Sequence, residues 1–205
     1  MSHPSVILIG GPPGAGKTTL GQALAVRLNG VSITADDLLT AAQGVTDRTT
    51  HPGLHVMRTG DSVAYFTDRP VSQLMADASE QAEALWPAIR QLVERRARDA
   101  TPYILDGWML RPDRVAELDR SRVGSLWLIP SAETLAGREG ANPFFARSHD
   151  PDRMLTQFLA RSRWCSELVA STAAAHGLPI LRQDGSVDVA TLCDRAVEAL
   201  EADGA

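Results

Sequence analysis

Short apolar runs alternate along the chain with longer segments that have helical periodicity. The apolar runs are bounded by Gly, Pro and Asp, a pattern typical of a parallel sheet covered by helices. It predicts one α/β domain over residues 1–205. We expect strands at residues 5–9, 31–34, 103–105, 125–129 and 179–181, and helices at residues 17–28, 37–43, 71–100, 112–119, 132–138, 152–175 and 189–202.

Two segments lack a clear period. Residues 44–69 are rich in Gly, Pro, Thr and Asp, and together with the next helix they are expected to form an acceptor-side insertion at about residues 44–100. Irregular segments of this length inside a domain are often functional. Residues 139–150 interrupt the helices after the fourth strand, and we expect a lid at about residues 138–152.

The strongest chemical signal is a glycine-rich loop between the first strand and the first helix. Residues 11–18 fit the pattern Gly, four residues, Gly, Lys, Ser or Thr. Glycines let backbone amides point at phosphate oxygens, and the next helix dipole attracts anions. Lys17 is also the only lysine among 20 Lys and Arg residues. The expected phosphate-binding residues are Gly11, Pro12, Pro13, Gly14, Ala15, Gly16, Lys17, Thr18 and Thr19.

This loop resembles the Walker A loop of P-loop nucleoside triphosphatases and kinases. The resemblance implies ATP and Mg²⁺ as cofactors, with Lys17 on the outer phosphates and the Thr18 hydroxyl as a metal ligand. The element order is similar to that of gluconate, shikimate and nucleoside monophosphate kinases, and of antibiotic phosphotransferases. The expected fold is a P-loop fold with a lid, whose five parallel strands lie in the order 2-3-1-4-5, flanked by helices.

Asp106 ends the third predicted strand and is followed by a glycine. A carboxylate there can hold magnesium or orient an acceptor hydroxyl, whereas the alternative is an aspartate that only starts a turn. The surrounding Leu-Asp-Gly resembles a signature of nucleoside monophosphate kinases, where an Arg and a Pro follow shortly. Here Trp108, Met109 and Leu110 precede Arg111, so the substrate role of that arginine is not carried over.

Asp36 and Asp37 follow the second strand directly. In the resembling kinases an aspartate at this place accepts the proton of the attacking hydroxyl, so both are candidate bases. Asp36 is favoured because it leaves the strand first. The alternative is helix capping, in which Thr34 or Asp36 satisfies the free amides of the next helix.

Several arginines fall around the predicted lid. Arg138 precedes it, Arg147 lies within it, and Arg161 and Arg163 follow it. In the resembling kinases, lid arginines close over the triphosphate and stabilise the transferred group. We therefore expect Arg138, with one of Arg161 or Arg163, to act in this way, although any single arginine is otherwise a solvated surface residue.

The loop after the last strand is the expected contact for adenine, by the same resemblance. The residues of this loop are Asp184, Gly185, Ser186 and Val187. The alternative is a polar loop that caps the next helix.

Other residues carry weaker signals. No metal-binding spacing is found among the basic residues of the insertion, which are His51, His55, Arg58 and Arg69. Trp108 is the aromatic residue most suited to contact an acceptor. The aromatic residues expected to pack in the core or lid are Trp86, Trp108, Trp127, Phe144 and Phe145.

The composition bears on partners and location. A formal net charge of -5 disfavours a nucleic-acid partner. Cys165 and Cys193 form neither a disulfide framework nor a metal motif, so we expect ordinary thiols in a reducing cytoplasm. The apolar run at residues 6–9 is too short for a signal peptide, and no stretch reaches the roughly 18 apolar residues of a membrane span.

Three functions fit these observations. The favoured one is ATP-dependent transfer of a γ-phosphate to a hydroxyl, or a phosphate, of a small molecule of unknown identity. The second is a nucleotide-hydrolysing switch or binding module that acts on a partner. A guanine-specific Asn-Lys-x-Asp motif is excluded because Lys17 is the only lysine. The third, a polynucleotide- or tRNA-directed kinase, is disfavoured by the net charge.

Overall fold

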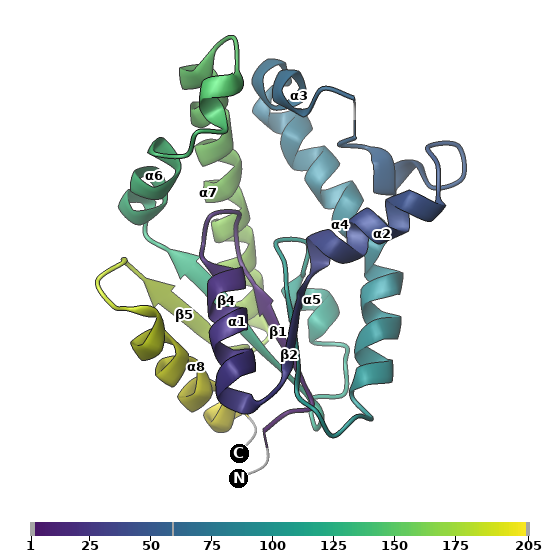
Figure 1. The fold of residues 1–205 in the computed structure, drawn as a ribbon, viewed down its shortest axis with the longest axis vertical. Helices are drawn as coiled ribbons and strands as arrows, with labels where there is room; N and C mark the ends of the chain where they lie inside the picture. The colour runs from purple at the N-terminus through teal and green to yellow at the C-terminus, as the bar shows by residue number, and fades with distance from the viewer. Residues whose placement is uncertain (1–2, 59, 204–205) are drawn as a thin grey trace.

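The computed structural model describes residues 3–58 and 60–203. Its centre is a five-stranded sheet, parallel throughout, with the order β2-β3-β1-β4-β5 (Figure 1). This is the predicted strand order. The strands are β1 (Val6–Gly10), β2 (Val31–Thr34), β3 (Tyr103–Asp106), β4 (Val123–Pro130) and β5 (Ile180–Gln183).

Helices cover both faces of the sheet, because the strands are apolar on both sides. On one face α1 (Lys17–Leu28) and α8 (Val189–Asp203) pack against alternate strand residues. On the other face lie α4 (Val71–Arg96), α5 (Pro112–Val115) and α7 (Pro151–Ala175). The described residues contain no helix with the length and apolar content needed to cross a membrane.

The strand register sets what meets at the carboxyl edge of the sheet. Ile9 of β1 pairs with Asp106 of β3, and Thr34 of β2 also pairs with Asp106. The glycine-rich loop that follows β1, the end of β3 and the start of α2 (Ala35–Val45) are therefore neighbours. At Gly107 an added Cβ would lie 2.5 Å from the Cβ of Ala35, which shows how closely the two chain segments approach.

The insertion contains more regular structure than the sequence pattern predicts. A 3₁₀ turn, η1 (Pro52–His55), and a helix, α3 (Ser62–Asp68), lie within residues 44–69. Asp61 caps α3 by accepting hydrogen bonds from the amides of Val63 and Ala64. This short helix lacks apolar periodicity and is held by tertiary contacts with α7.

The predicted lid joins α6 (Ala132–Gly140) to α7 through a second 3₁₀ turn, η2 (Phe145–Arg147). In Figure 1 this connection and α3 lie at the same end of the molecule, beyond the carboxyl edge of the sheet. The Thr67 and Ser148 hydroxyl oxygens are 2.7 Å apart, and the side-chain amide of Gln157 donates to the carbonyl of Thr67. The lid segment and the insertion are therefore bonded to each other.

The sheet has very little spare room at the end of β1. Trp127 on β4 is fully buried, and a Cβ added at Gly10 would lie 2.1 Å from its ring. No side chain fits at that distance unless the indole moves. The close packing of β1 on β4 thus depends on a glycine at this position.

We predict that Gly10→Ala destabilises the protein by about 1–3 kcal/mol or more, because the new methyl group overpacks the core. Chemical denaturation measures the loss. In the double variant Gly10→Ala/Trp127→Leu the smaller side chain leaves space, so its loss should be less than the sum of the two single losses.

Gly137→Ala is the matched control, since Gly137 lies in α6 and a Cβ there would meet nothing within 4 Å. We expect this variant to be neutral or slightly more stable. Equal losses for the two alanine variants, or strict additivity in the double variant, would contradict the packing argument.

Candidate active site

The glycine-rich loop adopts a backbone that only glycine accommodates easily. Gly11, Gly14 and Gly16 have φ angles of 143°, 77° and 91°. At Gly11 an added Cβ would also lie 2.2 Å from the carbonyl oxygen of Leu128. The loop leads into the amino-terminal end of α1, where free amides and the helix dipole favour a bound anion.

Lys17 is buried at the base of this loop, and its Nζ donates to the carbonyl of Pro12 at 2.8 Å. Burial lowers the pKa of Lys17 below its ordinary value of 10.5, while Cys165, Asp106 and Asp36 oppose that shift. The ammonium group thus lies within electrostatic reach of two carboxylates, one at the end of β3 and the other in the first turn of α2.

Asp106 is buried beside the loop, as predicted. Its Oδ1 accepts a hydrogen bond from the Thr18 hydroxyl at 2.8 Å, and its Oδ2 has no hydrogen-bond partner. Burial raises the pKa of Asp106, and the Thr18 hydrogen bond and Lys17 act in the opposite direction. A carboxylate oxygen left without a partner beside a hydroxyl fits a hard cation such as Mg²⁺.

No cluster of three or more His, Cys, Asp or Glu side chains able to hold a metal occurs within residues 3–58 and 60–203. Mg²⁺ in nucleotide sites commonly takes only one or two protein ligands and the rest from phosphates and water. Thr18 and Asp106 are the residues that could hold it.

Arg138 lies over the loop, as expected, and a residue that sequence reasoning missed holds it there. The guanidinium of Arg138 donates to the carbonyls of Gly14 and Ala15 at 3.4 and 3.3 Å, and to Gln183 Oε1 at 3.3 Å. Gln183 in turn donates to the Ala15 carbonyl at 2.8 Å. Gln183 ends β5 at the carboxyl edge of the sheet, two residues beyond the predicted end of that strand. A longer strand prediction would have placed it at the site.

These residues line a cavity of about 510 Å³ beside the loop. Val187 also lines it, as expected for the adenine loop, but Asp184, Gly185 and Ser186 are exposed and do not. They form a turn in which Asp184 accepts from the Ser186 amide. Of the four predicted adenine-loop residues, the structure thus places only Val187 in the lining of this cavity. The other lining residues are Gly14, Ala15, Gly16, Lys17, Thr18, Thr19, Leu20, Arg138, Gln183, Val189 and Leu192.

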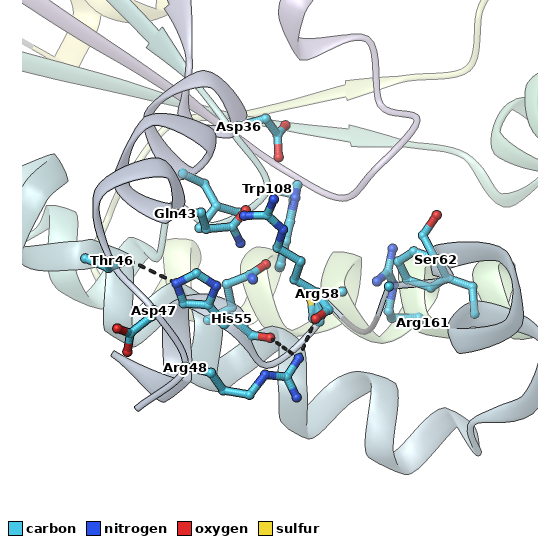
Figure 2. A pocket seen from close by; sticks show the side chains of 15 residues that line it. Asp36, Gln43, Thr46, Asp47, Arg48, His55, Arg58, Ser62, Trp108 and Arg161 are labelled. Carbon is cyan, nitrogen blue, oxygen red and sulfur yellow. Dashed lines mark hydrogen bonds between the residues drawn. The ribbon is translucent and has the colours of Figure 1, made fainter. Parts of the chain in front are cut away.

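A second and larger cavity, of about 760 Å³, opens between α2, the insertion and α7 (Figure 2). Asp36 and Arg161 come to it from different elements, and Trp108 lies between them in the view. Its size suits a small molecule. The lining residues are Asp36, Leu39, Gln43, Thr46, Asp47, Arg48, His55, Met57, Arg58, Gly60, Ser62, Phe66, Gln81, Trp108 and Arg161.

The structure separates the two candidate aspartates. Asp36 lines the larger cavity and Asp37 does not. Thr34 is the residue that caps α2, because its hydroxyl accepts from the Asp36 amide at 2.8 Å. Among the described residues no hydrogen bond to either carboxylate occurs, so capping does not account for them. Asp36 also acts electrostatically on both Lys17 and Asp106.

The arginines near the lid are separated in the same way. Arg161 is buried and lines the larger cavity. Arg163 instead lines a different cavity between α6 and α7, with residues such as Leu135 and Glu167. Arg147 is exposed, 5.8 Å from the ring of Phe144. Neither member of the predicted pair lines the cavity beside the phosphate loop, and Arg161 is the one that lines the larger cavity together with Asp36.

Solved structures of several enzymes share this architecture. Shikimate kinase from Bacteroides thetaiotaomicron is 19% identical, with a TM-score of 0.55, covering 96% of this chain and 98% of that one. Gluconokinase from Sinorhizobium meliloti is 18% identical, with a TM-score of 0.56, covering 98% and 94%. Thymidylate kinase from Candida albicans is 16% identical, with a TM-score of 0.54, covering 98% and 92%. At these identities the similarity shows the fold alone, and no curated protein matches the sequence.

The strand order and the glycine-rich loop after β1 define a P-loop nucleoside triphosphatase fold of the type found in small-molecule kinases. The chain belongs to the AAA domain family, whose model matches residues 6–163. The matched range includes the phosphate loop, the insertion and the lid. The fold prediction is therefore confirmed.

We predict that Lys17→Ala weakens binding of Mg·ATP and abolishes turnover, since no other lysine can replace the ammonium group. Lys17→Arg should also fail, because the planar guanidinium does not fit a buried site shaped for a compact ammonium. Calorimetric titration with ATP measures the effect. Arg27→Ala is the control, because Arg27 lies on the same helix but forms an exposed ion pair with Asp194. Unchanged ATP affinity in Lys17→Ala would contradict the site.

We further predict that Asp106→Asn stabilises the nucleotide-free protein above acidic pH. Because burial raises the pKa of Asp106 above its ordinary value of 3.8, the folded state holds this proton more tightly than the unfolded state. Below pH 3.8 the carboxyl group is protonated in both the folded and the unfolded state, so no charge is buried on folding. As the pH rises through the raised pKa, the buried group ionises and the wild-type protein loses stability. The Tm difference between variant and wild type should grow over that window and then level off.

Asp119→Asn provides a control of opposite sign. Hydrogen bonds from Ser121 lower the pKa of this exposed carboxylate, so its removal should not stabilise the protein. A pH-independent Tm difference for Asp106→Asn would show that the buried carboxylate carries no such cost.

Proposed function

We propose that this protein is an ATP-dependent phosphotransferase that moves a γ-phosphoryl group to a hydroxyl of a small molecule. The observation that carries the proposal is the position of Asp36. This carboxylate lines the larger cavity and also acts electrostatically on Lys17 of the phosphate loop. A second cavity that carries a carboxylate close enough to act electrostatically on Lys17 is what a kinase needs and what a switch does not.

Each group has a distinct part in the proposed reaction. The loop amides and Lys17 bind the phosphates, and Arg138 is positioned by Gln183 to stabilise charge on the transferred group. Asp36 accepts the proton of the acceptor hydroxyl as the oxygen attacks phosphorus. Thr18 and Asp106 would hold Mg²⁺, which supplies charge neutralisation between the phosphate oxygens.

Phosphoryl transfer has a loose transition state, so positioning and charge neutralisation contribute more than proton removal. The hydrogen bonds that join Arg138, the buried Gln183 and the Ala15 carbonyl support this order of importance. It fixes one cation and the loop backbone before a nucleotide arrives, so less reorganisation is needed during the reaction.

ATP consumption with and without a library of small alcohols tests the function. Turnover that depends on an added alcohol, with a phosphorylated product seen by mass spectrometry, supports the kinase. Hydrolysis that depends on a protein or nucleic-acid partner, and on no alcohol, would support the switch or the polynucleotide kinase instead.

We predict that Asp36→Asn lowers acceptor-dependent kcat by about 10²- to 10⁴-fold, the usual contribution of a general base, and leaves ATP affinity intact. Asp37→Asn is the matched control, since Asp37 lies on the same turn outside the cavity. It should keep near-normal kcat. Full activity in both variants with normal Tm values would show that neither aspartate is the base.

A further inference from the structure

Arg161 is a buried cation whose positive charge has no negative partner. It comes from α7 and is 7% exposed. Its Nη1 has no hydrogen-bond acceptor, and within residues 3–58 and 60–203 no carboxylate lies within ion-pair distance of it. Leaving a buried charge unpaired costs free energy, and such charges are normally paired or bound to a ligand.

The groups closest to Arg161 do not supply a negative charge. The thiol of Cys165 and the phenol of Tyr65 act on it electrostatically. Burial raises the pKa of Cys165 and also that of Tyr65, so both are neutral at pH 7. The Tyr65 hydroxyl donates to Asp77, and that carboxylate also accepts from Gln73. The buried acid of this region is thus already engaged.

Aromatic rings surround the guanidinium of Arg161 and offset only part of the free-energy cost of burying its unpaired charge. Its central carbon lies 5.0 Å from the ring centre of Phe66, 5.7 Å from Phe158 and 5.9 Å from Trp108. A cation over an aromatic face gains about 0.5–2 kcal/mol. The rings also exclude water, so any anion that reaches Arg161 would be bound in a low-dielectric setting, where its attraction is strong.

Most other unpartnered buried atoms in the described chain do not belong to an unpaired charge. Those of Arg111, Asp113 and Arg114 belong to side chains that form ion pairs, and those of Trp127 and Ser162 are neutral. The remaining one belongs to Asp106 at the nucleotide site, where Lys17 and the Thr18 hydroxyl stabilise the carboxylate.

We infer that the larger cavity binds an acceptor with an anionic group, a carboxylate or a phosphate, which pairs with Arg161. This inference rests on the proposed function. The anion lies against the Arg161 end of the cavity, among Phe66 and Trp108, and the acceptor hydroxyl faces Asp36. The planar guanidinium can donate two parallel hydrogen bonds to either kind of oxyanion. An uncharged acceptor would leave the buried cation unpaired.

The test uses pairs of alcohols in which one member carries an anionic group and its partner is neutral. The probes are glycolate and glycolamide, 4-(hydroxymethyl)benzoate and its amide, and glycerol phosphate and glycerol. Binding to the full-length protein, loaded with a non-hydrolysable ATP analogue and Mg²⁺, is measured by saturation-transfer NMR and calorimetry. We expect the charged member of at least one pair to bind on the order of 30-fold or more tightly than its neutral partner.

Arg161→Met should reduce this preference to about 3-fold or less, because its neutral side chain of similar length cannot pair with an anion. Arg161→Lys keeps a charge and should retain part of the preference, which guards against a packing defect in the methionine variant. Arg163→Met is the matched control, since Arg163 lies on the same helix and lines another cavity. It should retain the full preference.

The probes also show whether the cavity prefers a carboxylate or a phosphate, according to which charged probe binds more tightly than its neutral partner. Equal binding of every charged and neutral pair, no binding of any charged probe, or a preference that survives Arg161→Met would overturn the inference. If the inference is overturned but a neutral alcohol is phosphorylated in an Asp36-dependent reaction, the kinase proposal would still stand. Charge-dependent binding without any phosphorylated product would instead remove the kinase proposal and leave the anion site.

Discussion

The parallel register of β1, β2 and β3 is the constraint on which the site depends. It sets Ile9 and Thr34 opposite Asp106, so the phosphate loop, one buried carboxylate and the start of α2 meet at one edge of the sheet. A shift of one residue would turn Asp106 to the opposite face, away from Thr18. The apolar strand residues on both faces prevent such a shift, because each is buried under helices.

The same edge explains how the nucleotide cavity is connected to the lid. Gln183 at the end of β5 and Arg138 on α6 are both bonded to the Ala15 carbonyl of the loop. Farther out, the lid segment is bonded to the insertion through Thr67 and Ser148. The predicted lid segment therefore contacts the phosphate loop through Arg138 at one end and α3 through Ser148 near the other.

The sequence predicts the strands and the phosphate loop well, because both depend on local signals: short apolar runs, and glycines at fixed spacing. It cannot predict α3, whose ends are fixed by Asp61 and by contacts with α7. It favours Asp36 over Asp37 only because Asp36 leaves the strand first; adjacent residues of a helix differ by about 100° in direction, so the packed structure is needed to show which one faces the cavity. Gln183 carries no motif, so only the extent of β5 identifies it.

Within the described part of the chain, the carboxylate of Asp106, with one oxygen unpartnered, and the unpaired guanidinium of Arg161 mark the two ends of the space in which the chemistry is proposed to occur. Helices such as α2 and α7 have side-chain caps and many surface charges form ion pairs, so the departures from these rules at Asp106 and Arg161 are informative. Each group lowers the stability of the ligand-free protein. A bound cation at Asp106 and a bound anion at Arg161 would remove both costs, so the binding energy of the ligands would also stabilise the fold.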